Sequence, residues 1–170
     1  DVEFVEKATP HFINKDKFMA WLTTVSSHMT YKSSSKTGDM YLDIYKDEDW
    51  DITAKRYMSK LKIVDNAIGE LLDELESSGK LEDTVIMLFA DHYPYGLSDE
   101  SFASIAKYDT SSNGDTDRTP FIIYNPSLTP TKFDDYTTFV NILPTMANLF
   151  DLDYDPRLYA GTDLLSDTYD

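Results

Sequence analysis

Apolar residues along the chain fall into short continuous runs and one long periodic stretch. Continuous runs of apolar and β-favouring side chains predict buried strands at residues 18–25, 84–90 and 121–124. Residues 51–78 predict a long amphipathic helix closed by Gly79, because apolar side chains recur at spacings of three and four and form a stripe: Tyr57, Leu61, Val64, Ile68, Leu71 and Leu75. Strands that alternate with helices predict an α/β fold with a parallel sheet.

Polar stretches separate these elements. Residues 30–49 and 98–117 are rich in Ser, Thr, Asp and Gly and are predicted as loops, the second with a short helical segment at residues 102–107. Residues 138–150 are apolar at helical spacing, and Pro144 fits a helix that begins just before it. The chain is most simply one domain.

Composition narrows the classes of function. The 170 residues include 31 Asp plus Glu against 15 Lys plus Arg, a formal net charge of −16. This charge repels phosphate backbones, so we expect no nucleic-acid partner. It indicates a solvated exterior, or carboxylates that hold cations. Cysteine is absent, which excludes disulfides and thiolate zinc sites. No apolar stretch reaches the roughly 18 residues of a membrane span.

Two of the three histidines follow predicted strands. His28 comes shortly after Val25, the last residue of the first run, and Asp91 and His92 directly follow the run that ends at Ala90. The carboxyl ends of parallel strands lie at one edge of a sheet, where open α/β sheets place their chemistry. Carboxylate and imidazole groups bind Mn²⁺, Mg²⁺ or Zn²⁺. Asp91 and His92 therefore predict half of a metal site, because a catalytic metal usually has three or four protein ligands.

The rest of the chain supplies no further recognisable chemistry. His11 adjoins Pro10 and lies far from any predicted strand end, so we expect a structural role for it. No Gly-x-Ser-x-Gly motif, Gly-rich phosphate loop or His-Glu-x-x-His motif occurs. From its residues alone the chain predicts half a metal site and offers no recognisable nucleophile motif.

Six segments follow one another along the chain: FMAWLTTVSSHMTY, YMSKLKIVDNAIGELLDELESSGKLEDT, VIMLFADHY, DRTPFIIYNP, NILPTMANLFDLD and AGTDLL. In this order they resemble the C-terminal half of a sulfatase-like domain of the alkaline phosphatase superfamily. Within that superfamily they most resemble the lipoteichoic acid synthase group. The resemblance implies a three-layer αβα sandwich with a mainly parallel sheet, of which residues 1–170 form the C-terminal portion.

The resemblance also implies roles for single residues. It makes Asp91 and His92 ligands of a catalytic divalent cation, Mn²⁺ in this group, with Mg²⁺, Zn²⁺ or Ca²⁺ as alternatives. It makes His28 a substrate-binding residue that contacts phosphate or glycerol. Arg118 matches a structural position, and Asn141 stands near a helix start where many relatives carry Asp, with the same capping ability. The nucleophile, a Thr in this branch, and a further acidic ligand come from the first half of the domain, so we expect no catalytic nucleophile in this chain.

The implied function of the complete protein is transfer of phosphoglycerol from phosphatidylglycerol on the outer face of a Gram-positive cell membrane. The chain, which begins at Asp1 without a Met, is then a fragment of a larger enzyme anchored by N-terminal transmembrane helices. A sulfatase or phosphoethanolamine transferase of the same fold, acting on another phospholipid or a sulfate or phosphate ester, is an alternative. A non-catalytic binding module with a decayed site is another. The fragment is expected to be inactive and, because a cut sheet exposes an edge strand, to dimerise.

Overall fold

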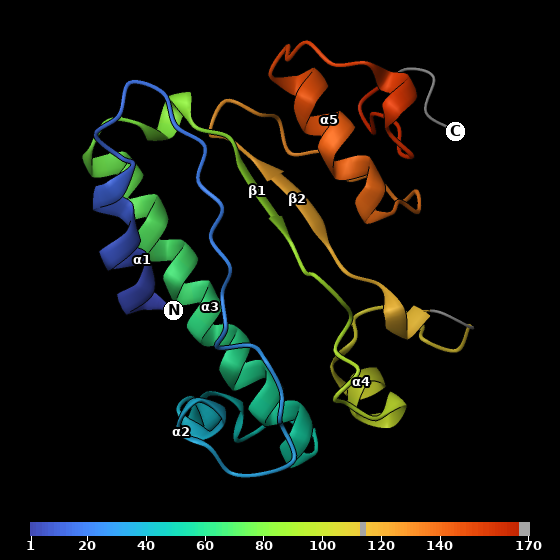
Figure 1. Cartoon of the computed structure of the whole chain (residues 1–170). Coiled ribbons are helices and arrows are strands. Elements are labelled where there is room, and N and C mark those ends of the chain that lie inside the picture. Colours follow the sequence, from blue (N-terminus) through green and yellow to red (C-terminus); the bar gives the residue numbers. More distant parts are fainter. Residues whose placement is uncertain (113–114, 167–170) are drawn as a thin grey trace. The chain divides into compact units, whose positions relative to one another are not determined.

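The computed structural model describes residues 1–112 and 115–166, and the chain divides into two compact units, Asp1–Leu128 and Thr129–Asp170 (Figure 1). The helices and strands of the first unit are α1 (Val2–Ala8), α2 (Lys36–Asp39), α3 (Ile52–Ser77), β1 (Ile86–Phe89), α4 (Asp99–Ile105) and β2 (Phe121–Tyr124). The second unit contains α5 (Ile142–Leu149). Short 3-10 turns lie at Thr9–His11, Leu42–Tyr45, Leu81–Asp83, Asp115–Asp117, Phe139–Asn141 and Pro156–Leu158.

The long helix α3 is confirmed, and each end has a cause in the sequence. At its start the Asp51 carboxylate accepts hydrogen bonds from two backbone N–H groups of the first turn, at 2.6 and 2.9 Å. After its last turn Gly79 has a φ of 68°, a left-handed conformation that glycine adopts without strain. The amides of Gly79 and Lys80 donate back to carbonyl groups of the last turn, at 2.9 and 2.8 Å, and so form a Schellman motif.

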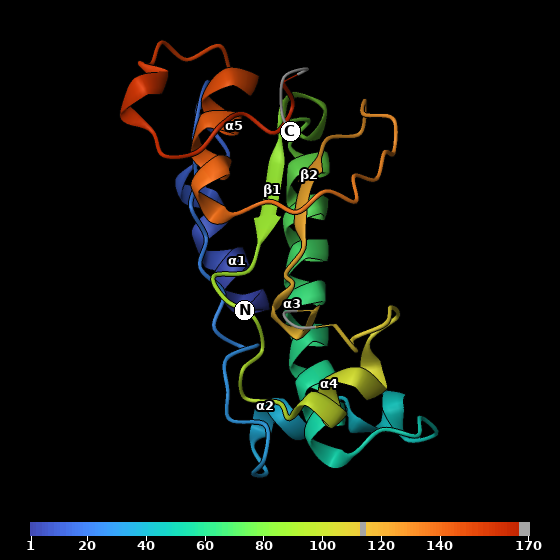
Figure 2. The ribbon, with the colours of Figure 1, turned by 90° about the vertical axis from the view of Figure 1, so that its right-hand side faces the viewer.

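The buried face of α3 differs from the predicted stripe. Among the stripe positions at residues 57, 61, 64, 68, 71 and 75, only Leu75 is fully buried; Ser59, Lys60, Ile63 and Ala67 are the other buried positions beyond the first turn. Helices α1 and α2 pack against α3 (Figure 2). Strand β1 contacts α3 through the apolar cluster that Leu75 forms with Ile13 and Ile86. Because neighbours cover several sides, apolar spacing identifies the helix without identifying its most buried side.

The two strands form a sheet of a different kind from the one expected. β2 coincides with a predicted strand and β1 lies inside one, but the two pair antiparallel, with Ile86 opposite Tyr124 and Phe89 opposite Phe121. The mainly parallel sheet and the three-layer sandwich are therefore not confirmed by the described residues. A parallel pair needs a crossover that returns along the sheet. Here α4 has only seven residues and lies beyond the carboxyl end of β1, so the chain turns back instead (Figure 1).

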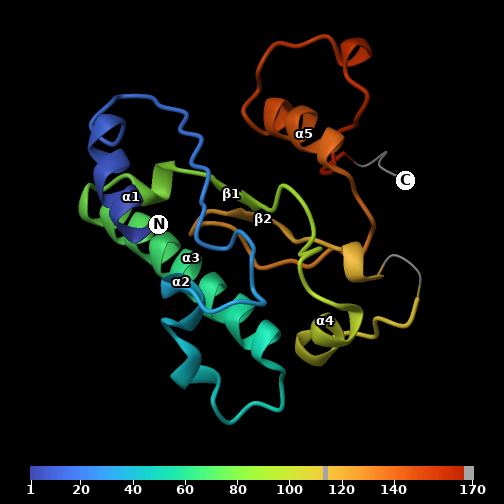
Figure 3. The ribbon, with the colours of Figure 1, turned by 60° about the horizontal axis from the view of Figure 1, so that its bottom comes forward.

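The prediction of a strand at residues 18–25 is wrong. The segment is extended and runs beside β1 in the same direction (Figures 1 and 3). The Trp21 ring packs edge-on against Phe89, with 5.5 Å between the ring centroids. The segment forms no ladder within the part of the chain that the structure describes, and Met19, Trp21 and Val25 are exposed. Hydrogen-bond pairing makes a strand, and the apolar pattern reports only an extended chain.

The loops and the remaining helices are predicted with mixed success. The expected loop at residues 30–49 contains α2 and the turn Leu42–Tyr45, which its polar composition conceals. The helical segment expected at residues 102–107 corresponds to α4. Helix α5 begins two residues before Pro144, as predicted.

Asn141 has a different role in the second unit from the cap expected of it. It precedes α5, but its side chain makes no cap hydrogen bond. Its Oδ1 accepts from the Thr162 amide and its Nδ2 donates to the Thr137 hydroxyl, both at 3.0 Å. Gly161 permits this close packing, because a Cβ there would lie 2.1 Å from the Val140 carbonyl oxygen. Asn141 thus ties the C-terminal loop to the start of α5.

Candidate metal and substrate site

The loop that follows β1 and the loop that follows the extended segment lie side by side. A Cβ on Gly96 would lie 3.3 Å from the Met29 Cβ and 2.8 Å from Cε2 of Tyr31. Residues 29–32 and 95–98 line a common pocket of about 260 Å³. The two loops that carry the predicted site residues therefore meet at one end of the first unit.

Asp91 and His92 lie within contact distance of each other in the loop that follows β1. Nδ1 of His92 lies 2.8 Å from the Tyr93 carbonyl oxygen. A carbonyl oxygen only accepts hydrogen bonds, so Nδ1 carries a hydrogen and Nε2 is the ring nitrogen left for another partner. That Nε2 lies 3.5 Å from Oδ1 of Asp91. Two atoms that each lie about 2.1 Å from a tetrahedral cation are about 3.4 Å apart, so the observed spacing has room for a shared cation and is also that of an ion pair between Asp91 and a protonated His92.

The donor set of this chain fits a divalent cation in part. The side chains of Asp91 and His92 are 86% and 40% exposed, so an ion can reach both. Carboxylate and imidazole suit Mn²⁺, Mg²⁺ and Zn²⁺. In residues 1–112 and 115–166 no group of three or more His, Asp or Glu side chains gathers around a common point. The chain thus offers two ligands, and a complete catalytic site needs one or two more.

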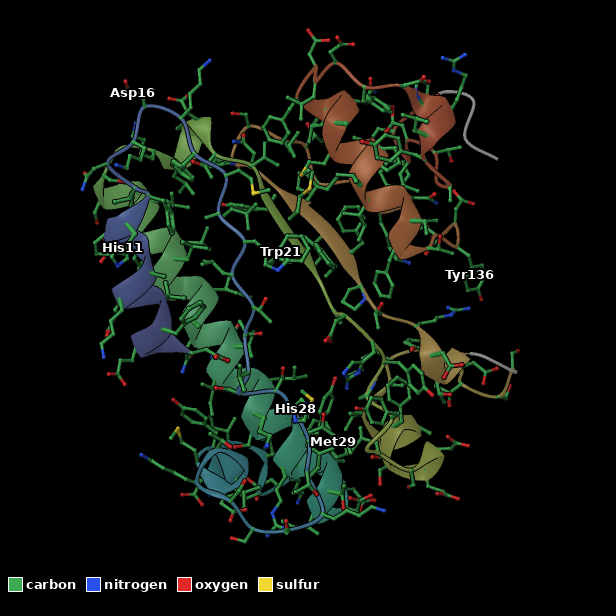
Figure 4. All side chains as sticks on the ribbon, viewed as in Figure 1. His11, Asp16, Trp21, His28, Met29 and Tyr136 are labelled. Carbon is green, nitrogen blue, oxygen red and sulfur yellow. The ribbon has the colours of Figure 1, made fainter. Side chains whose placement is uncertain are left out.

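His28 has the same local arrangement as His92. Its Nδ1 lies 2.8 Å from the Met29 carbonyl oxygen, and its ring is exposed. His28 and Met29 lie close together in Figure 4. The backbone of His28 is also held. The His28 amide donates to the Val25 carbonyl at 3.0 Å, and Nζ of Lys60 donates to the His28 carbonyl at 2.6 Å.

Two buried residues that the sequence did not single out lie behind the His28 loop. Tyr31 is 4% exposed and donates its hydroxyl to the Ser27 carbonyl at 2.9 Å. Burial raises the pKa of Tyr31 to about 12, so the hydroxyl remains a donor at neutral pH. Lys60 is 6% exposed, burial lowers its pKa, and its ammonium lies 5.7 Å from the Tyr31 ring centroid. In the sequence, Lys60 stands three residues before Ile63, and this helical spacing places both residues on the same, buried side of α3.

Arg56, one turn earlier on α3, holds the far end of the same loop. Its guanidinium donates to the Lys32 carbonyl at 3.0 Å and to the Asp39 carboxylate at 2.7 Å. Hydrogen bonds from Ser34 and Arg56 lower the pKa of Asp39, so this carboxylate stays ionised and the contact persists at neutral pH. Lys60 and Arg56 therefore bind the loop at two carbonyl groups.

The other residues singled out from the sequence lie elsewhere. His11 ends the first 3-10 turn, beside α1 and away from His28 (Figure 4). The guanidinium of Arg118 lies over the Tyr108 ring, 5.3 Å from its centroid. The structure brings neither residue to the pocket that residues 29–32 and 95–98 line.

Comparison with known proteins gives the same family that the sequence segments resemble. The model of the Sulfatase family matches residues 1–152. A lipoteichoic acid synthase of Staphylococcus saprophyticus is 27% identical over 172 residues, which cover 98% of this chain and 26% of that protein. A lipoteichoic acid synthase of Staphylococcus aureus strain USA300 is 27% identical over 157 residues, 89% of this chain and 23% of that protein. The chain thus spans about a quarter of the length of these relatives. Within its described residues no helix has the length and apolar character to cross a membrane.

Proposed function

The chain belongs to the sulfatase family of the alkaline phosphatase superfamily, and we propose that it forms part of a metal-dependent phosphoglycerol transferase. The donor substrate would be phosphatidylglycerol and the product a lipoteichoic acid-type polymer. Two relatives that align along nearly the whole chain are lipoteichoic acid synthases, which supports this choice. The complete protein would act on the outer face of the cell membrane.

The observation that carries the proposal is the 3.5 Å separation between Nε2 of His92 and Oδ1 of Asp91. At this distance a neutral imidazole nitrogen and a carboxylate oxygen are two acceptors that face each other, and a shared cation or proton relieves their repulsion. We assign Asp91 and His92 to a divalent cation, for which Mn²⁺ is the first candidate. When bound, such an ion acts as a Lewis acid on a phosphoryl oxygen.

His28 would serve the substrate rather than the metal. With Nδ1 committed to the Met29 carbonyl, the Nε2 atom of a protonated ring can donate to a phosphate oxygen, and that of a neutral ring can accept from a glycerol hydroxyl. The neighbouring pocket, which Tyr31 and Tyr95 help to line, provides room for the part of the substrate next to that group. The nucleophile and the remaining ligands would come from other parts of the complete protein.

Turnover of phosphatidylglycerol by the full-length protein in lipid vesicles tests the proposal. Diacylglycerol release should require Mn²⁺, Asp91→Asn should lose manganese binding and activity together, and His28→Ala should lose activity while manganese remains bound. His11→Ala, an exposed histidine beside α1, is the matched control and should behave like the wild type.

Three results would contradict the proposal in different ways. Hydrolysis of a sulfate ester without turnover of phosphatidylglycerol would assign the protein to the sulfatases. Turnover of phosphatidylethanolamine instead would indicate a phosphoethanolamine transferase. Absence of metal binding together with absence of any turnover would indicate a binding module with a decayed site.

A further inference from the structure

Lys60 is an unusual residue in the middle of α3, because its side chain is buried and yet carries an ammonium group. It is 6% exposed, whereas lysine is almost never this buried unless it is paired. Within the described part of the chain no carboxylate forms an ion pair with it. Transfer of an unpaired ammonium from water into an apolar environment is costly, so the contacts that Lys60 does make deserve a functional explanation.

Those contacts converge on the loop that carries His28. Nζ of Lys60 donates to the His28 carbonyl oxygen at 2.6 Å, a short charge-assisted hydrogen bond. The same ammonium lies 5.7 Å from the centroid of the buried Tyr31 ring, and the Tyr31 hydroxyl donates to the Ser27 carbonyl. The backbone on both sides of His28 is thus bound from behind by buried side chains.

The geometry links this backbone contact to the orientation of the imidazole. Nδ1 of His28 bonds to the carbonyl of the next residue, Met29, at 2.8 Å. The ring is therefore held by the Met29 carbonyl, and the peptide that leads to Met29 is held at the His28 carbonyl by Lys60. Movement of that peptide would carry the ring with it.

We propose that Lys60 is a positioning residue that sets the orientation of the His28 imidazole through its hydrogen bond to the His28 carbonyl oxygen. The proposal rests on the substrate-binding role proposed above for His28. Lys60 itself contacts no reacting atom. Its buried charge binds the carbonyl from the helix side, so that the opposite side of the loop is left to the ligand.

The test compares Lys60→Met with Lys62→Met, the same change two residues along α3. Lys62 bonds to Asp65 on the helix surface at 2.5 Å, so its loss reports only on charge and helix propensity. Histidine ring signals in heteronuclear NMR spectra of the chain provide a readout that needs no activity. Lys60→Met should shift the His28 ring signals and leave those of His11 in place, Lys60→Arg should restore them in part, and Lys62→Met should change neither.

Kinetic measurements on the full-length protein test whether the positioning of His28 affects activity. We expect Lys60→Met to lower kcat/KM for the phospholipid donor about 10- to 100-fold with manganese affinity unchanged, and Lys60→Arg to recover part of this loss. A folded Lys60→Met variant with unshifted His28 signals would overturn the positioning role. A different outcome is that Lys60→Met shifts the His28 signals while even the wild type does not turn over the phospholipid donor. This outcome would contradict the proposed function but would still support the positioning of His28 by Lys60.

If Lys60→Met does not fold, NMR measurements on the Lys60 ammonium of the wild type test the proposal instead. The proposal requires a Lys60 ammonium that exchanges slowly with water and shows proximity signals to the Tyr31 ring. An ammonium that exchanges as fast as that of Lys62 would overturn it.

Discussion

The two loops of the candidate site are held in different ways. Residues 27–32 are bound from α3, where Lys60 and Arg56 donate to the carbonyl groups of His28 and Lys32. Residues 91–97 are held by contacts between near neighbours, such as the Tyr95 amide to the Tyr93 carbonyl at 2.8 Å and the Leu97 amide to the Pro94 carbonyl at 2.9 Å. The proposed substrate side is thus held by long side chains of α3, while the proposed metal side is held by local hydrogen bonds and by the packing of Gly96 against Tyr31.

The largest expected effect comes from removing the buried side chain behind the first loop. Tyr31→Ala should lower the free energy of unfolding by about 3 kcal/mol, because it empties the space between Tyr57 and Gly96. Urea denaturation measures this loss. Tyr95→Ala, at a residue that is half exposed in the second loop, is the control and should cost much less. Equal losses would mean that the two loops do not differ as described.

Gly96 is the contact between the loops, and a single methyl group tests it. Gly96→Ala places a Cβ 2.8 Å from the Tyr31 ring, so we expect a loss of about 1–3 kcal/mol of unfolding free energy from overpacking. Gly69→Ala inside α3 meets no atom within 4 Å and should instead stabilise the protein, by about 0.5–1 kcal/mol. Thermal denaturation of both variants measures whether each change raises or lowers the unfolding free energy. A stabilising effect of Gly96→Ala would contradict the close approach of the two loops.

Asp51 connects α3 to the helix that follows the second loop. Its carboxylate caps α3 and accepts a hydrogen bond from Ser101 of α4, so Asp51→Ala should cost about 1 kcal/mol of unfolding free energy. Burial opposes ionisation of Asp51, but the bonds from Ser101, Ala54 and Thr53 outweigh it and lower its pKa.

The sign of the pH effect follows from this lowered pKa. A carboxyl group whose pKa is lower in the folded state stabilises the fold above its unfolded-state value, and that stabilisation disappears as the pH falls through the folded-state pKa. Denaturation midpoints between neutral pH and pH 2 should therefore fall less steeply for Asp51→Ala than for the wild type. Parallel pH curves would show that the Asp51 carboxylate does not contribute to acid sensitivity.

The smallest effect on stability is expected on the metal side. Asp91→Asn should leave the unfolding free energy unchanged without metal, because the side chain is 86% exposed. The same change should weaken manganese binding to the full-length protein roughly 10-fold or more, since it removes a charged ligand. Titration calorimetry measures the affinity. A fold destabilised by Asp91→Asn without metal would show that the second loop is not held as described.

Much of the local structure follows from the sequence. The periodic apolar positions, the Asp51 cap and Gly79 define α3 almost to the residue, and the apolar run at residues 121–124 defines β2. The position of Asp91 and His92 directly after the run at residues 84–90 predicts a metal-ligand pair, and the structure places the two side chains 3.5 Å apart; their role as ligands stays a prediction. These features depend on residues that are close together in the chain, where backbone preferences and side-chain spacing act directly.

Other features depend on which segments meet. Residues 18–25 have the composition of a strand but no ladder partner among the described residues, and the two observed strands pair antiparallel because α4 does not cross back over them. The buried side of α3 was also misjudged, since several neighbours cover the helix. Apolar patterns report that a side chain avoids water but do not report which neighbour covers it.

By itself the sequence determined the helices α3 and α5, the apolar runs and the placement of one carboxylate and two histidines after such runs. Only the tertiary structure decided that a lysine of α3 is buried against the His28 carbonyl, and that Gly96 brings the two loops together. The physical reason is distance along the chain. Lys60 lies 32 residues from His28, and a contact over that separation is set by the packing of whole elements rather than by any local preference of the residues that form it.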